Sequence, residues 1–182
     1  MKSARGWVGV RPRALWLSAI LAGLFTLATA SSAWAQATIF VVRHAERADQ
    51  VEGGTAMMTT DPDLSAVGQA RAESLAAMLK DAGIRTIFVT QYKRTQQTAA
   101  PLATALGVTP EQVGSREVDA LAQQLRAASG SILVVGHSNS VPNLLKALGT
   151  GTSVEIAETE YDNLFIVTLG GEKPTVARLR YR

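Results

Sequence analysis

The sequence predicts an α/β domain whose mainly parallel sheet carries an antiparallel addition at one edge. Three short apolar runs have the composition of buried strands, and each is followed by a segment with helical spacing: residues 38–42, 86–90 and 131–136. Strands that alternate with helices favour a parallel sheet covered by those helices. Two further strand-like runs, 163–169 and 175–181, are joined by a turn that contains Gly170-Gly171, which predicts a hairpin at the edge.

The first 35 residues are predicted to be a secretory signal peptide. Basic residues precede an apolar stretch at 14–30, and Ala33-Trp34-Ala35 has the pattern of a cleavage site, so cleavage is expected near Ala35. An uncleaved membrane anchor is the alternative, but the stretch is short for a span of about 20 residues. The domain is therefore expected to comprise residues 36–182, located in the periplasm or secreted.

Removing this segment changes the charge of the chain. The whole sequence has 18 basic and 15 acidic residues, and four of the basic residues but none of the acidic ones lie in the first 35, which leaves a net charge of −1. The remaining chain therefore predicts no nucleic-acid partner, and no later stretch is apolar enough to span a membrane. The absence of Cys excludes disulfides and thiolate metal sites, and an exported chain without disulfides fits a bacterial periplasm.

Polar residues and residues that favour helix ends predict the loops and helices between the strands. Residues 45–62 are expected to form a loop over the end of the first strand, and Ser65 can cap the helix that follows, which Gly83 ends. The remaining expected elements are a helix that stops at Gly107, a loop at 108–115, a helix near 119–128 and a helix from Pro142 to Leu148.

The chain has two histidines, His44 and His137, and both follow a predicted buried strand. Arg43 directly precedes His44, and Arg94 lies four residues beyond the second strand. Because parallel strands end at one edge of the sheet, where open α/β sheets bind ligands, we expect these four side chains to converge. Guanidinium groups match phosphate oxygens geometrically, so the sequence predicts a site for a phosphate dianion.

The turn after His137 adds further donors to this site, since Ser138 and Asn139 precede a helix whose N-terminus favours anions. One neutral imidazole can accept a phosphoryl group and pass it to water, and the other, if protonated, can stabilise charge during transfer. This chemistry needs no metal or other cofactor, and the spacing alone does not decide which His attacks. Glu46 is either an acid in this site or a structural partner of Arg43 or Arg47.

Four segments resemble, in order, the motifs of the histidine phosphatase superfamily, the phosphoglycerate-mutase-like proteins. They are Arg43-His44-Ala45-Glu46; residues 63–72, which are similar to Leu-Ser/Thr-x-x-Gly-x-x-x-Ala; Arg94-Thr95-Gln96-Gln97-Thr98-Ala99; and Val135-Gly136-His137-Ser138-Asn139. The resemblance covers nearly all of residues 38–148. It implies a three-layer α/β/α fold and cofactor-independent chemistry. It also implies that His44 is the phosphorylated nucleophile and that Arg43, Arg94 and His137 complete the phosphate pocket.

One departure from the family pattern concerns the acid. Many members place a Glu that protonates the leaving alcohol in a Leu-x-Glu-x-x-x-Gly-type segment between the third and fourth motifs. Here that region is shortened, and Glu111, Glu117 and Asp119 fit the pattern poorly. Either Glu46 or another acid then serves, or the leaving group needs no acid, as in phosphohistidine or an acyl phosphate.

The small domain, without lid insertions, resembles a phosphatase more than a mutase. We predict an exported, metal-independent phosphatase of the histidine acid type that hydrolyses a small phosphate monoester through a phosphohistidine at His44, as a monomer or weak dimer. The alternatives are a protein phosphohistidine phosphatase, a non-catalytic binder of phosphorylated ligands, and a metal site formed by His44, His137 and Glu46. Specificity is expected to lie in the loops at 45–62, 108–117 and 149–162.

Overall fold

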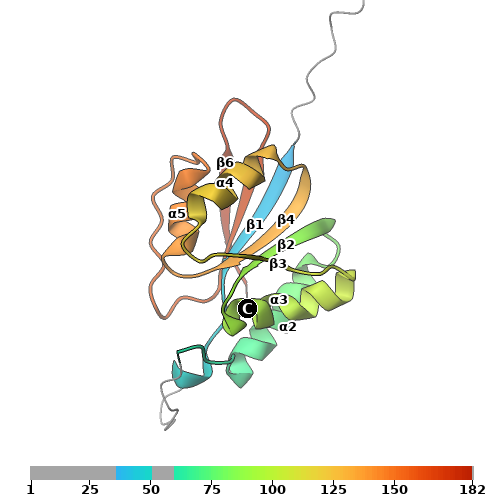
Figure 1. Cartoon of the computed structure of the whole chain (residues 1–182), viewed down its shortest axis with the longest axis vertical. Coiled ribbons are helices and arrows are strands. Elements are labelled where there is room, and N and C mark those ends of the chain that lie inside the picture. The colour runs from blue at the N-terminus through green and yellow to red at the C-terminus, as the bar shows by residue number, and fades with distance from the viewer. Residues whose placement is uncertain (1–35, 51–59, 182) are drawn as a thin grey trace, which may run out of the picture. The chain divides into compact units, whose positions relative to one another are not determined.

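A six-stranded sheet with the strand order β3-β2-β4-β1-β5-β6 lies at the centre of the computed structural model (Figure 1). The structure describes residues 36–50 and 60–181, all within one unit, Trp34–Arg182. The strands are β1 (Ala37–Arg43), β2 (Ile84–Thr90), β3 (Glu111–Val113), β4 (Gly130–Gly136), β5 (Asn163–Leu169) and β6 (Thr175–Arg180). The helices are η1 (Ala48–Gln50), α2 (Ala66–Leu79), α3 (Lys93–Leu106), α4 (Val118–Ala127) and α5 (Ser140–Ala147).

The pairing of the strands confirms the predicted mixed sheet. β1 and β2 both run parallel to β4, and β3 runs parallel to β2. The C-terminal hairpin adds β5 antiparallel to β1, and β6 antiparallel to β5 at the edge. The four strands that precede the hairpin therefore all end at the same edge of the sheet, which is where the predicted site residues lie.

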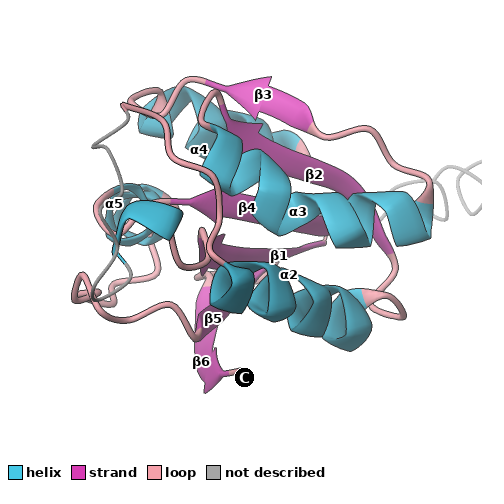
Figure 2. Cartoon of the chain, turned by 90° about the horizontal axis from the view of Figure 1, so that it is seen from below, coloured by secondary structure: helices cyan, strands magenta, loops and turns pink. Residues whose placement is uncertain are grey.

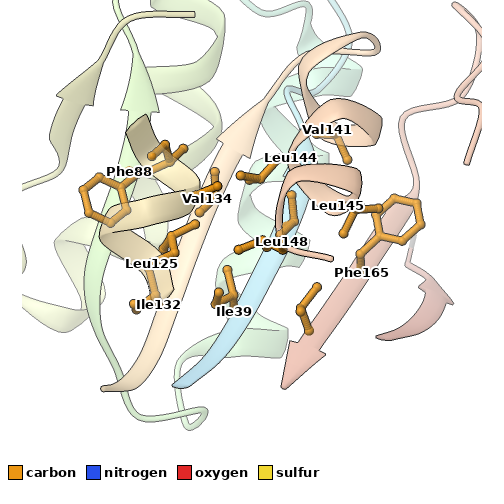
Figure 3. Packing of buried hydrophobic residues seen from close by; sticks show 14 of the residues in the cluster. Ile39, Phe88, Leu125, Ile132, Val134, Val141, Leu144, Leu145, Leu148 and Phe165 are labelled. Atoms are coloured by element: carbon orange, nitrogen blue, oxygen red, sulfur yellow. The ribbon is translucent and has the colours of Figure 1, made fainter. Parts of the chain in front are cut away.

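Two pairs of helices cover the two faces of the sheet (Figure 2). Alternate residues of β1 belong to different cores: Ile39 and Val41 pack with α4 and α5, whereas Phe40 and Val42 pack with α2 and α3. Figure 3 shows the first of these cores, where the side chains of α4 and α5 contact β1, β2, β4 and β5. This alternation gives the three-layer α/β/α arrangement, because both faces of each central strand must be buried.

Several predicted boundaries agree with the structure. The Ser65 hydroxyl caps α2 by accepting from the Gly68 N–H, and Gly107 ends α3 in the left-handed conformation with φ 66°. β2 begins at Ile84, before the predicted start, and α5 begins at Ser140, so Pro142 lies within its first turn. Within the described parts of the chain, no helix has the length and hydropathy needed to cross a membrane.

One expectation is wrong: the stretch 108–115 is not entirely a loop, because it contains β3. This three-residue strand pairs with the end of β2. Glu111 and Gln112 are exposed, and Val113 is half-buried. An edge strand of this kind carries no apolar alternation, so the sequence pattern gives no signal for it. The predicted signal peptide, and residues 51–59 of the predicted loop at 45–62, lie outside the described residues.

Candidate active site

His44 and His137 lie side by side because the strands that precede them are neighbours. In the parallel pair β1 and β4, Arg43 is opposite Gly136, and the His44 N–H donates to the Gly136 carbonyl at 2.9 Å. The two imidazole rings contact edge to face, with 5.4 Å between their centroids. The structure therefore brings together the two histidines that the sequence places 93 positions apart.

The His44 ring is oriented by a backbone carbonyl. Its Nδ1 lies 2.8 Å from the Ala45 oxygen, and because a carbonyl can only accept, the neutral ring donates from Nδ1. Nε2 then carries the lone pair, and no residue in the described parts of the chain forms a hydrogen bond with it. Burial lowers the pKa of His44 to about 3, and the nearby Arg43 contributes in the same direction. At neutral pH this ring is uncharged, as a nucleophile must be.

His137 is held by the hydroxyl of Thr90, which lies 3.0 Å from its Nε2. That hydroxyl is hydrogen-bonded in turn to the buried Thr95. Burial lowers the pKa of His137 to about 4, and the charge of Arg94 adds to the effect. The second imidazole is therefore neutral in the free protein, and a bound phosphate dianion would favour the protonated form in which it can stabilise charge.

These two buried imidazoles are expected to make the fold sensitive to acid. Their pKa values in the folded protein, about 3 and about 4, lie below the ordinary value of 6.5, so the unfolded chain binds more protons between these limits. The two histidines therefore do not lower the free energy of unfolding above pH 6.5, but they lower it as the pH falls below that value. By pH 4.5 the loss is on the order of 2 kcal/mol per His. Urea unfolding at pH 7 and 4.5 measures this loss.

The matched control for this measurement is the variant without one imidazole. Carboxylates also titrate below pH 5, but they do so equally in the wild type and in His44→Ala. The difference in unfolding free energy between pH 7 and pH 4.5 should consequently be smaller in His44→Ala by roughly the contribution of one His. Equal differences in the two proteins would contradict the low pKa of His44.

Arg43 and Arg94 bring buried positive charge close to the two histidines. The Arg43 side chain is 2% exposed and that of Arg94 is 13% exposed. The Nε of each is buried, and no hydrogen-bond partner for it exists among residues 36–50 and 60–181. An unpaired buried donor costs about 1–3 kcal/mol, so both arginines favour the arrival of an acceptor such as a phosphate oxygen.

All the predicted site residues except Glu46 line one cleft of about 460 Å³. Its lining comprises Arg43, His44, Arg47, Tyr92, Arg94, Ser115, Arg116, His137, Ser138, Asn139 and Glu158. Six of these residues were expected from the sequence as catalytic or substrate-binding groups. Arg47 and Arg116 were not, and they make the cleft more cationic than the motifs alone indicate. The cleft therefore has the charge, donors and buried imidazoles that a phosphate monoester requires.

Glu46, the acid proposed from the sequence, does not line this cleft. Both of its carboxylate oxygens accept from Arg71 of α2, at 2.7 to 2.9 Å, and Arg71 also donates to the Tyr181 carbonyl. Glu46 therefore joins the end of β1 to α2 and to the C-terminal strand region. The structural partner predicted for Glu46 was Arg43 or Arg47, but the partner in the structure is Arg71. Within the described ranges, no three His, Asp or Glu side chains gather as metal ligands.

Glu158 is a cleft carboxylate that the motifs did not identify. Its Oε2 accepts from Arg43 Nη2 at 2.8 Å, and its Oε1 accepts from the Ser138 hydroxyl at 2.7 Å. Arg43 Nη1 also donates to three backbone carbonyls of the same loop, those of Ala157, Glu158 and Glu160, at 2.8 to 3.1 Å. The loop at 149–162 was expected to carry specificity, but nothing in its composition marks this residue.

Two further motifs act by positioning the segment around His44. From α3, the buried Thr98 hydroxyl accepts from the Ala45 N–H at 2.9 Å and donates to the Arg94 carbonyl at 2.7 Å. From α2, Gly68 lies so close to Glu46 that an added Cβ would be 2.2 Å from its carbonyl oxygen. Only glycine permits this approach, which explains why the second motif contains it.

Comparison with known proteins gives a family match over part of the chain. The description of the histidine phosphatase superfamily (branch 1) matches residues 39–113, which include His44 and Arg94. The PE-PGRS family protein PE_PGRS11 of Mycobacterium tuberculosis is 41% identical over 85 residues, which are 43% of this chain and 14% of that protein. This chain therefore corresponds to a small part of that longer relative.

Solved structures share the fold at low identity. The protein histidine phosphatase SixA complexed with tungstate is 20% identical, with a TM-score of 0.59 over 79% of this chain and 96% of that one. A phosphoglycerate mutase from Bacillus anthracis is 14% identical, with a TM-score of 0.61 over 81% and 94%. A mycobacterial glucosyl-3-phosphoglycerate phosphatase is 14% identical, with a TM-score of 0.56 over 80% and 98%. These likenesses show a phosphoglycerate-mutase-like fold, and the description of the histidine phosphatase superfamily matches the part of that fold that runs from β1 to the end of β3.

Proposed function

We propose that this protein is a phosphatase that hydrolyses a phosphate monoester through a phosphohistidine intermediate at His44. The observation that carries the proposal is the state of the His44 ring. Its Nδ1 donates to the Ala45 carbonyl, its low pKa keeps it neutral, and its Nε2 is available beside His137 in a cationic cleft. This arrangement suits nucleophilic attack on phosphorus, whereas binding alone would not need an oriented lone pair.

The surrounding groups fit the two steps of such a reaction. Arg43 and Arg94 would hold the phosphate oxygens, with Ser138 and Asn139 as further donors at the start of α5. His137 would stabilise charge on the transferring group. His44 Nε2 forms a bond to phosphorus as the ester bond breaks; water then attacks the phosphohistidine, releasing inorganic phosphate and restoring His44. None of these steps requires a metal, so we propose metal-independent chemistry.

A second candidate substrate is phosphohistidine in a protein. The structural likeness to SixA, described as a protein histidine phosphatase, favours it. Residues 1–35 are proposed to direct export, and an exported enzyme meets small phosphate esters rather than cytoplasmic signalling proteins. We therefore propose a small monoester as the primary substrate, in the periplasm or outside the cell.

The test is release of inorganic phosphate from a panel of substrates by the purified protein. The panel contains p-nitrophenyl phosphate, sugar phosphates and a phosphohistidine peptide, each assayed with and without EDTA. We expect hydrolysis of at least one monoester at a rate that EDTA leaves unchanged. Tight phosphate binding without any turnover would instead identify a binding protein, and loss of activity in EDTA would identify a metal enzyme.

A further inference from the structure

Glu158 is the one carboxylate that lines the cleft among the residues that the structure describes. Its carboxylate accepts one hydrogen bond from Arg43 Nη2 and one from the Ser138 hydroxyl, so it bridges these two donors. Both residues are expected to bind the substrate phosphate. An incoming phosphate therefore competes with this carboxylate for the same hydrogen bonds, and the two groups must be adjacent when the cleft is occupied.

His44 and Glu158 lie at different depths in the cleft. His44 is 3% exposed, whereas the Glu158 side chain is 71% exposed, so the nucleophile is at the buried floor and the carboxylate at the mouth. In phosphoryl transfer, the attacking and leaving atoms lie roughly in line on opposite sides of phosphorus. A leaving oxygen opposite His44 Nε2 therefore lies toward the mouth, on the side of Glu158.

We infer that Glu158 is the acid that protonates the leaving oxygen of the substrate. The inference rests on the proposed phosphatase function and assigns the proton donor that the motif region between α3 and β4 does not supply. Glu46 is unsuitable because Arg71 binds both of its oxygens away from the cleft. Glu117 also serves elsewhere, since its side chain accepts from the Gly114 N–H ahead of α4.

Substrate binding changes the protonation of Glu158 in the direction that this role needs. In the free protein the Ser138 hydroxyl, together with Arg43, holds the pKa of Glu158 below its ordinary value, so it is ionised. A phosphate dianion takes over both partners and places negative charge beside the carboxylate. Both changes favour the protonated form. Binding of the substrate thus converts an ionised carboxylate into an acid next to the leaving group.

Glu158 gives up a proton in the first step of the reaction and regains one in the second. As the His44 Nε2–P bond forms, the P–O ester bond breaks, and its electron pair goes to the leaving oxygen, which takes the proton of Glu158 and departs as an alcohol. The Glu158 carboxylate next accepts a proton from the water that attacks phosphohistidine. The N–P bond breaks, its electrons return to His44, and inorganic phosphate leaves.

The experiment compares two leaving groups in the wild type and in Glu158→Gln. p-Nitrophenolate departs readily without a proton, whereas an alkoxide does not, so only an alkyl phosphate depends on the acid. For Glu158→Gln we expect kcat/KM to fall about 10²–10³-fold with the alkyl phosphate and less than about tenfold with p-nitrophenyl phosphate. The descending limb of the kcat–pH profile with the alkyl phosphate should also disappear. Glu158→Asp should recover part of the lost activity.

Glu155→Gln is the matched control, because Glu155 is an exposed carboxylate of the same loop that does not line the cleft. It should match the wild type with both substrates. Equal losses with both substrates in Glu158→Gln would show that the residue only positions Arg43, and equal gains would show that it only competes with phosphate; either result overturns the inference. Failure of the proposed function is distinguishable, since wild-type protein would then hydrolyse neither substrate, or His44→Ala would hydrolyse both.

Discussion

Replacing His44 with Ala is expected to lower kcat for p-nitrophenyl phosphate by at least about 10⁴-fold, because the N–P bond then has no nitrogen to form with. In the wild type, the ring is fixed through Nδ1 and held neutral by burial. His137 lines the same cleft, but its own Nε2 is hydrogen-bonded to the Thr90 hydroxyl. It is therefore not expected to replace the missing nucleophile.

Steady-state kinetics with purified His44→Ala measure this loss. A thermal unfolding transition close to that of the wild type shows that the variant is folded, and affinity for inorganic phosphate shows that the cationic cleft is intact. We expect phosphate affinity to change by much less than kcat, because Arg43 and Arg94 remain. Turnover within about tenfold of the wild type in a folded variant would rule out covalent catalysis by His44.

Replacing His137 with Ala is expected to lower kcat by about 10²–10³-fold, the usual effect of removing one donor that stabilises transition-state charge. The imidazole is 5.4 Å from His44, centroid to centroid, and its low pKa in the free protein leaves it ready to gain a proton when a dianion binds. Because this stabilisation is greatest in the transition state, the effect should appear in kcat more than in KM.

The comparison between the two histidine variants separates their roles. His137→Ala retains the nucleophile, so it should still form phosphohistidine, only more slowly. Single-turnover kinetics with p-nitrophenyl phosphate follow that first step directly. If His137→Ala lost all phosphoenzyme formation while His44→Ala retained it, the assignment of the two imidazoles would have to be exchanged.

The parts of the site that could be predicted are those that end buried strands. An abrupt change from Ile, Phe and Val to Arg43-His44 marks the end of β1, and the same change marks His137 after β4. Parallel strands necessarily end at one edge, so convergence follows from the fold class. That β1 and β4 are direct neighbours does not follow from that pattern, because β2 and β3 come between them along the chain but not in the sheet.

The parts that could not be predicted depend on side-chain pairs between distant segments. Glu158 reaches the cleft from a loop without helical or strand periodicity, 115 positions after its partner Arg43. Arg43 and Arg47 are the arginines nearest to Glu46 in the sequence, but the packing of α2 against the end of β1 brings Arg71 to it instead. No local pattern encodes such choices, since they are made by the approach of whole elements.

The most direct test of the central claim is to quench turnover with ³²P-labelled substrate and to measure phosphate bound to the protein. We predict a label that is stable in alkali and labile in acid, that maps to the peptide containing His44, and that is absent from His44→Ala. Turnover with no such label under single-turnover conditions, or a label that persists in His44→Ala, would contradict a phosphohistidine at this residue.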